Sequence, residues 1–155
     1  MKKSFGLLFA GALTAALVAG CNSGNNNNTP LGFGTNCGPP PNGFQILYPR
    51  NNAPRVPPGQ ANAIYVAANP PLVVGNSYNF FVSQSNGNQQ FTSTFATFNG
   101  QIPAPHNSPA PGSTIYVANI VVSPIGPSQT VNLLWNDGGT GCTPNAIVSS
   151  YTTAP

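Results

Sequence analysis

The amino-acid sequence predicts an all-β fold: a single antiparallel β-sandwich of about seven strands, preceded by a signal peptide and a disordered tether. Three observations predict it. From about residue 38, short apolar runs alternate with Pro, Gly and Asn. Several of these runs alternate apolar with polar side chains. Prolines and glycines, of which the whole chain has 18 and 17, interrupt every window after the leader that is long enough for an amphipathic helix. Seven short strands at this spacing are typical of two packed antiparallel sheets.

The alternation is clear near the C-terminus, where Val131, Leu133 and Trp135 share one face of a strand and asparagines lie on the other. Residues 77–85 alternate in the same way. The sequence Ser-Asn-Gly-Asn at 85–88 then predicts a hairpin turn, because Asn and Gly readily adopt positive φ. The expected strands span residues 43–48, 63–68, 77–85, 90–99, 113–123, 130–136 and 146–152.

Residues 1–20 predict a signal peptide. Lys2 and Lys3 precede a run of sixteen mostly apolar residues, 5–20, as in the charged end and apolar centre of a secretory leader. The run is shorter than the roughly 20 residues of a stable membrane-spanning helix.

The leader ends Leu-Val-Ala-Gly-Cys at 17–21, which resembles the lipobox of bacterial lipoproteins. The resemblance implies that the Cys21 sulfur carries a diacylglycerol, that the leader is cut before it and that acyl chains such as palmitate anchor the protein in the cell envelope. Asn22 after the cysteine implies the outer membrane, if the organism is Gram-negative. The alternatives are a simple signal peptide whose cysteine forms a disulfide, or a retained membrane helix.

Residues 21–36 predict a flexible, Asn-rich tether, because they are polar, uncharged and poor in core-forming side chains. The folded domain is therefore expected at 37–155. If Cys21 is acylated, Cys37 and Cys142 remain as a pair, 105 positions apart. In an oxidising compartment we expect them to form a disulfide that links the two ends of the domain; two free or separately capped thiols are the alternative.

Charge is nearly absent from the mature chain. Only 3% of all residues are charged, and after the leader the charged side chains are Arg50, Arg55 and Asp137. Two arginines in a proline-rich loop do not form the basic stripe that nucleic acid requires, so no nucleic-acid partner is expected.

A second resemblance begins at Pro49. The sequence Pro-Arg-Asn-Asn-Ala-Pro-Arg-Val-Pro at 49–57, followed by the strand Ile-Tyr-Val-Ala at 64–67, resembles the opening of bacterial Ig-like domains. The resemblance implies an Ig-like sandwich over 37–155 that acts as an adhesive, spacer or accessory module rather than as an enzyme.

Little catalytic chemistry is available. Asp137 is the only acid and His106 the only histidine, which excludes a glycosidase carboxylate pair and argues against calcium and zinc sites. No metal or cofactor is expected. A hydrolase using His106 and Asp137, with Ser149 or Ser150 as nucleophile, is a remote alternative. The chain has no G-x-S-x-G elbow, and its sequence places His106 in a proline-rich loop and Asp137 in a turn.

Aromatic residues offer another alternative. Phe91, Phe95 and Phe98 do not all share a strand face, so at least one is expected to point outward. Exposed rings with Asn and Gln side chains could bind a polysaccharide. The first expectation is nevertheless a lipid-anchored protein of the bacterial cell envelope whose non-catalytic Ig-like domain acts as an interaction or spacer module. Its expected partners are the membrane, through the anchor, and an unknown envelope protein or polysaccharide.

Overall fold

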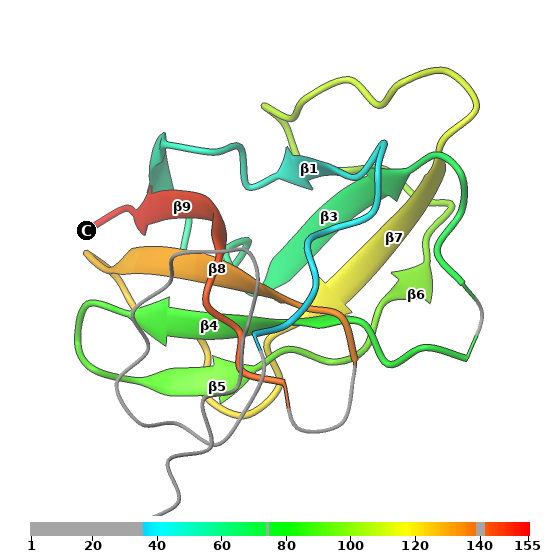
Figure 1. The fold of residues 1–155 in the computed structure, drawn as a ribbon. Coiled ribbons are helices and arrows are strands. Elements are labelled where there is room, and N and C mark those ends of the chain that lie inside the picture. Colours follow the sequence, from blue (N-terminus) through cyan, green and yellow to red (C-terminus); the bar gives the residue numbers. More distant parts are fainter. Residues whose placement is uncertain (1–35, 74, 139–141) are drawn as a thin grey trace, which may run out of the picture. The chain divides into compact units, whose positions relative to one another are not determined.

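The computed structural model describes residues 36–73, 75–138 and 142–155, which form a β-sandwich of two sheets (Figure 1). The predicted signal peptide, Cys21 and the tether up to residue 35 lie outside the described residues. One sheet has four strands in the order β1-β3-β7-β6, and the other has five in the order β2-β9-β8-β4-β5. The strands are β1 (Gln45–Tyr48), β2 (Ala53–Val56), β3 (Ala63–Ala68), β4 (Asn79–Gln84), β5 (Gln89–Phe91), β6 (Ala96–Thr97), β7 (Thr114–Asn119), β8 (Thr130–Asn136) and β9 (Ile147–Thr153).

The strand order is that of an immunoglobulin-like sandwich. In such domains strands A, B, E and D form one sheet, and C, F and G form the other. Taking β2 and β5 as additional edge strands, β1-β3-β7-β6 corresponds to A-B-E-D and β9-β8-β4 to G-F-C. The predicted all-β sandwich is therefore confirmed, and its strand order matches the immunoglobulin-like arrangement.

Two details differ from the sequence prediction. Residues 53–56, expected in a proline-rich loop, form β2, which pairs in parallel with β9, so the five-stranded sheet is mixed rather than purely antiparallel. Pro54 is tolerated there because an edge strand needs hydrogen bonds to one neighbour only. The single strand expected at 90–99 is two short strands in different sheets, because the chain crosses between the sheets after Thr92, whose Oγ1 accepts the Phe80 N–H at 3.1 Å.

The core lies between the two sheets. Val131, Leu133 and Trp135 of β8 are buried there, as their alternation predicts. Phe80 and Val82 of β4 are also fully buried. The hairpin predicted at 85–88 connects β4 to β5, with Gly87 at a φ of 87°. In the part of the chain that the structure describes, no helix is long and apolar enough to cross a membrane.

Candidate functional site

The outer face of the five-stranded sheet carries apolar side chains where an exposed sheet face is usually polar. In β4, Phe80 and Val82 point into the core, so Phe81 between them points outward and is half-buried. Phe81 is paired with Phe91 of β5 on one side and with Leu134 of β8 on the other. Leu134 is in turn paired with Ile147 of β9. We call Phe91, Phe81, Leu134 and Ile147 the apolar row.

The apolar row crosses four neighbouring strands, β5, β4, β8 and β9, which run side by side in Figure 1. Its two ends are the most open: 46% of Phe91 and 60% of Ile147 remain exposed. The rings of Phe81 and Phe91 have centroids 5.2 Å apart and meet edge to face at 63°. The row is therefore a continuous apolar ridge, but its two rings do not form one flat platform.

Neutral polar side chains flank the apolar row. On one side Ser83, Asn132 and Ser150 are paired across β4, β8 and β9. On the other side Asn136 donates from Nδ2 to Oδ1 of Asn79 at 2.9 Å. The sequences of these four strands contain no charged residue. An apolar strip with a neutral polar rim is the composition of a binding surface that needs no charge complementarity.

The predicted disulfide between Cys37 and Cys142 is present, with Cα atoms 4.8 Å apart. It joins the start of the domain to the segment between β8 and β9. Beside it, Asn36, expected as the last residue of the tether, pairs with Thr143. The disulfide and this pairing therefore hold residues 36 and 37 against the segment between β8 and β9.

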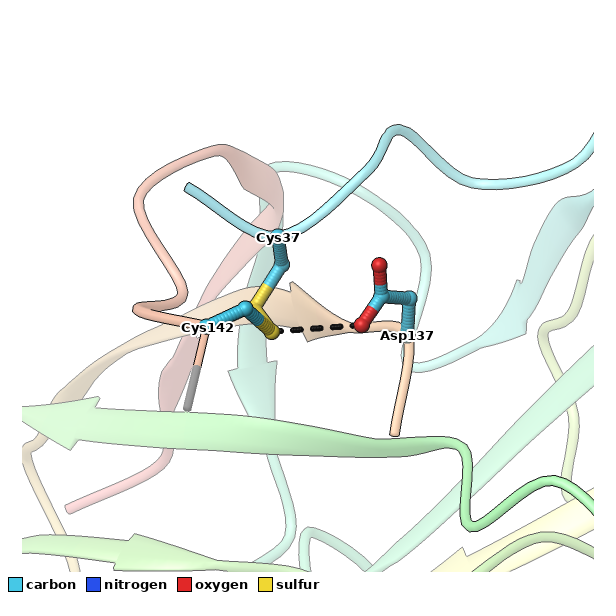
Figure 2. A group of neighbouring side chains, drawn as sticks. All are labelled: Cys37, Asp137 and Cys142. Carbon is cyan, nitrogen blue, oxygen red and sulfur yellow. Dashed lines mark hydrogen bonds between the residues drawn. A yellow bond between two sulfur atoms is a disulfide. The ribbon is translucent and has the colours of Figure 1, made fainter. Parts of the chain in front are cut away.

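Asp137 lies next to this disulfide, at the end of β8 (Figure 2). Its Oδ2 accepts the Gly38 N–H at 2.8 Å, and its Oδ1 lies 3.2 Å from Cys142 Sγ, the contact drawn as a dashed line. An oxidised sulfur carries no hydrogen, so this second contact is not a hydrogen bond. Both sulfurs and the carboxylate lie within 4.8 Å of one another, but zinc is bound by thiolates, and in the disulfide neither sulfur is one.

The residues considered for a hydrolase lie on different elements of the domain. His106 is exposed between β6 and β7, with Nδ1 3.0 Å from the carbonyl oxygen of Asn107. Ser149 is 1% exposed and faces the core, and its Oγ has no hydrogen-bond partner among the described residues. Ser150 lies on the outer side of β9. The described contacts therefore show no serine activated by His106.

Most aromatic side chains belong to the core. Trp135 is 1% exposed, stacks with Tyr78 and Phe95 at centroid distances of 5.4 and 5.9 Å, and its buried Nε1 has no partner among the described residues. Of the three phenylalanines considered for an exposed position, Phe91 points outward, whereas Phe95 and Phe98 pack against the core. A shallow hollow of about 370 Å³ next to Trp135 is lined by Pro39, Pro41, Asn76, Tyr78, Trp135, Asp137 and Gly138.

Sequence reasoning missed the apolar row. Phe81 and Leu134 are the two apolar residues that interrupt the polar side of their alternating strands. That interruption was the available signal, but the register that places them beside Phe91 and Ile147 cannot be read from one strand alone. Comparison of the chain with protein-family models, with curated proteins and with solved structures found no match.

Proposed function

We propose that this chain is a lipid-anchored protein of the bacterial cell envelope, and that its Ig-like domain binds a protein partner through the apolar row. The leader, which resembles that of bacterial lipoproteins, supports the anchor at Cys21. The disulfide supports an oxidising compartment outside the cytoplasm. The apolar row is the single observation that carries the binding role.

A row of neighbouring apolar side chains is unusual on a protein surface that has no binding role. Isolated exposed apolar residues are common on proteins, whereas contiguous apolar patches mark interaction sites. Here Phe91 and Ile147 are exposed at the two ends of one row, and half-buried Phe81 and Leu134 connect them. Burying this row against a partner would remove apolar area from water at roughly 25 cal/mol per Å².

The row favours a protein over a polysaccharide. Sugars stack on flat ring faces, and the 63° angle between Phe81 and Phe91 gives no common plane for two sugar units. Leu134 and Ile147 are aliphatic and add surface that suits another protein's apolar side chains. The lack of charge on the four strands also lets the face meet an apolar partner without burying an unpaired ion.

Polysaccharide binding remains the second candidate, and one observation favours it. Phe91 is a single exposed ring on β5, with Gln89 beside it on the same outer face. One ring and one amide are enough to stack and hydrogen-bond a single sugar unit. In that case Phe91 alone would carry the binding, and Ile147, at the other end of the row, would contribute nothing.

A binding screen separates the two candidates. The mature chain with Cys21→Ser, lacking residues 1–20, would be tested against peptidoglycan, surface polysaccharides and envelope proteins of the source organism. For a protein partner, Phe91→Ser and Ile147→Ser should each weaken binding. The matched control is Val122→Ser, because Val122 is 78% exposed but lies outside the row. Equal loss in the control would contradict the proposal, and loss with Phe91→Ser alone on a glycan would favour the second candidate.

The anchor is tested separately. Mass spectrometry of the protein extracted from membranes should find Cys21 as the first residue, carrying a diacylglycerol. Cys21→Ser should release the protein from the membrane fraction or leave its leader uncut. An unmodified Cys21 in the mature protein would contradict the lipid anchor. That result would have no bearing on the proposed binding face.

A further inference from the structure

The two arginines of the mature chain lie at one small cavity. Arg50 and Arg55 are both exposed, and both line a cavity of about 80 Å³ next to β2. Ala104 and Pro105, from the segment between β6 and β7, also line this cavity. No lysine and no other arginine follows the leader. The cationic side chains of the domain are therefore gathered at one place on a surface that is otherwise almost uncharged.

The backbone on both sides of Ala53 brings these side chains to the cavity. A turn, with the Ala53 N–H donating to the Arg50 carbonyl at 3.0 Å and Asn52 at a φ of 59°, places Arg50 before β2. Arg55 lies in β2 itself, where the register with β9 shifts between Ala53 and Val56. Such an irregularity in a strand redirects a side chain away from the regular alternation.

Arg55 has a φ of 58°, in the left-handed region. That conformation is unfavourable for a residue with a Cβ atom, and glycine is its usual occupant in a bulge of this kind. An arginine at such a position is destabilising compared with the residue the backbone prefers. Conformational strain of this sort is concentrated at functional sites, where the side chain has a use that offsets it.

We propose that Arg50 and Arg55 bind a single oxyanion, a phosphate or carboxylate group. Guanidinium groups recognise these anions through paired N–H donors, and the pairing is stronger than between neutral groups. The cavity is smaller than the roughly 300 Å³ at which small-molecule pockets begin, so only one charged group of a larger molecule would enter.

The test is a phosphate titration of the mature chain carrying Cys21→Ser, followed by NMR signals of the arginine Nε–H groups and of the 50–56 backbone. We expect saturable shifts in both arginines. Arg50→Gln should weaken phosphate binding by about tenfold, equivalent to about 1.4 kcal/mol. Arg55→Gly should weaken it similarly while leaving the melting temperature unchanged or higher, because glycine accepts the left-handed conformation. Weaker phosphate binding together with an unchanged or higher melting temperature would show that Arg55 acts in binding rather than in stabilising the fold.

One further variant controls for net charge, and a vesicle comparison identifies the source of the phosphate group. Arg50→Gln with Val122→Arg keeps the net charge and moves one cation to another exposed site, so it should not restore binding. Vesicles of phosphatidylglycerol, compared with phosphatidylcholine, distinguish the source: retention that requires Arg50 and Arg55 indicates a lipid headgroup. Phosphate binding without vesicle retention indicates a phosphate carried by another molecule. Unmoved arginine signals, or full binding by Arg55→Gly or by the charge-relocated variant, would overturn the proposal.

Discussion

The same strands form the inner and outer faces of the five-stranded sheet, but the side chains of the two faces differ in how deeply they are buried. On the inner face of β8, Leu133 and Trp135 are buried in the core. On the outer face of the same strand, Leu134 belongs to the apolar row and is half-buried. The inner residues stabilise the fold by leaving water. The outer residues gain less from folding, and their apolar character is the basis of the proposed binding role.

The largest difference between the faces should appear in a pair of alanine variants on β8. Trp135→Ala removes a buried ring that stacks with Tyr78 and Phe95, and should lower the free energy of unfolding by about 3–5 kcal/mol. Leu134→Ala should lower it by less than about 1.5 kcal/mol. Denaturant unfolding of both variants measures the contrast. Equal losses would show that the outer face supports the fold as much as the core does.

The disulfide should have the next largest effect. Replacing Cys37 and Cys142 together by serine removes a crosslink between residues 105 positions apart. We expect a loss of about 2–4 kcal/mol, because the unfolded chain regains the freedom of a long loop. Denaturant unfolding with and without a reducing agent measures it, and the double variant should no longer respond to the reductant. An unchanged stability would mean that the disulfide does not constrain the unfolded chain.

A smaller change in the free energy of unfolding is expected at high pH, and it tests the burial of Tyr151 in the core. Tyr151 is buried and donates its O–H to the Ala61 carbonyl at 2.9 Å. Burial, and then the nearby Tyr48, raise the pKa of Tyr151 well above its usual 10.0. Burial also raises the pKa of Tyr48. Above about pH 10 the unfolded chain loses the Tyr151 proton while the folded protein keeps it, so the unfolding free energy should fall as pH rises.

Tyr151 lowers the unfolding free energy by at most about 1.4 kcal/mol for each pH unit above 10. Below pH 10 Tyr151 is protonated in both the folded and the unfolded state, so it causes no decline there. Tyr151→Phe should make the decline with pH shallower and leave the part due to Tyr48. Unfolding curves at pH 8, 10 and 11 measure the two slopes. Identical slopes in the two proteins would contradict a protonated, buried Tyr151.

The smallest effect on stability is expected in the apolar row. Phe91→Ser and Ile147→Ser should each change the unfolding free energy by less than about 1 kcal/mol, because both side chains are largely exposed in the folded domain. Thermal unfolding measures this, with Val122→Ser as the control. A loss of several kcal/mol would place these residues in the structural framework rather than in a binding face.

Much of the fold could be predicted from the sequence, because a buried face imposes a strict pattern. The alternation at Val131, Leu133 and Trp135 identified β8 with its observed bounds, and 63–68 likewise matches β3. The strand at 53–56 could not be predicted, because Pro54 and the prolines beside it are usual for a loop and its parallel partner β9 lies about a hundred residues away. Residues 90–99 form parts of two strands because the chain passes from one sheet to the other there, and no local sequence pattern indicates that passage.

The candidate sites were less predictable for the same physical reason. The apolar row exists only when β5, β4, β8 and β9 are in register, so Phe91 and Ile147 give no joint signal in the sequence. The cavity at the arginines is lined by residues from two segments, 48–57 and 104–105, and the left-handed φ of Arg55 has no signal in the sequence. The pairing of Cys37 with Cys142 was predictable, because the proposed acylation of Cys21 leaves an even number of cysteines.

The most direct test of the binding face is site-specific photo-crosslinking on living cells. A photoreactive phenylalanine derivative would replace Phe91 in one protein and Val122 in another, both produced as the full chain with the proposed anchor residue Cys21 unchanged. We predict one discrete protein adduct from position 91, lost when Ile147→Ser is added, and no such adduct from position 122. No adduct from position 91, or the same adducts from both positions, would contradict the assignment of the apolar row as the interaction surface.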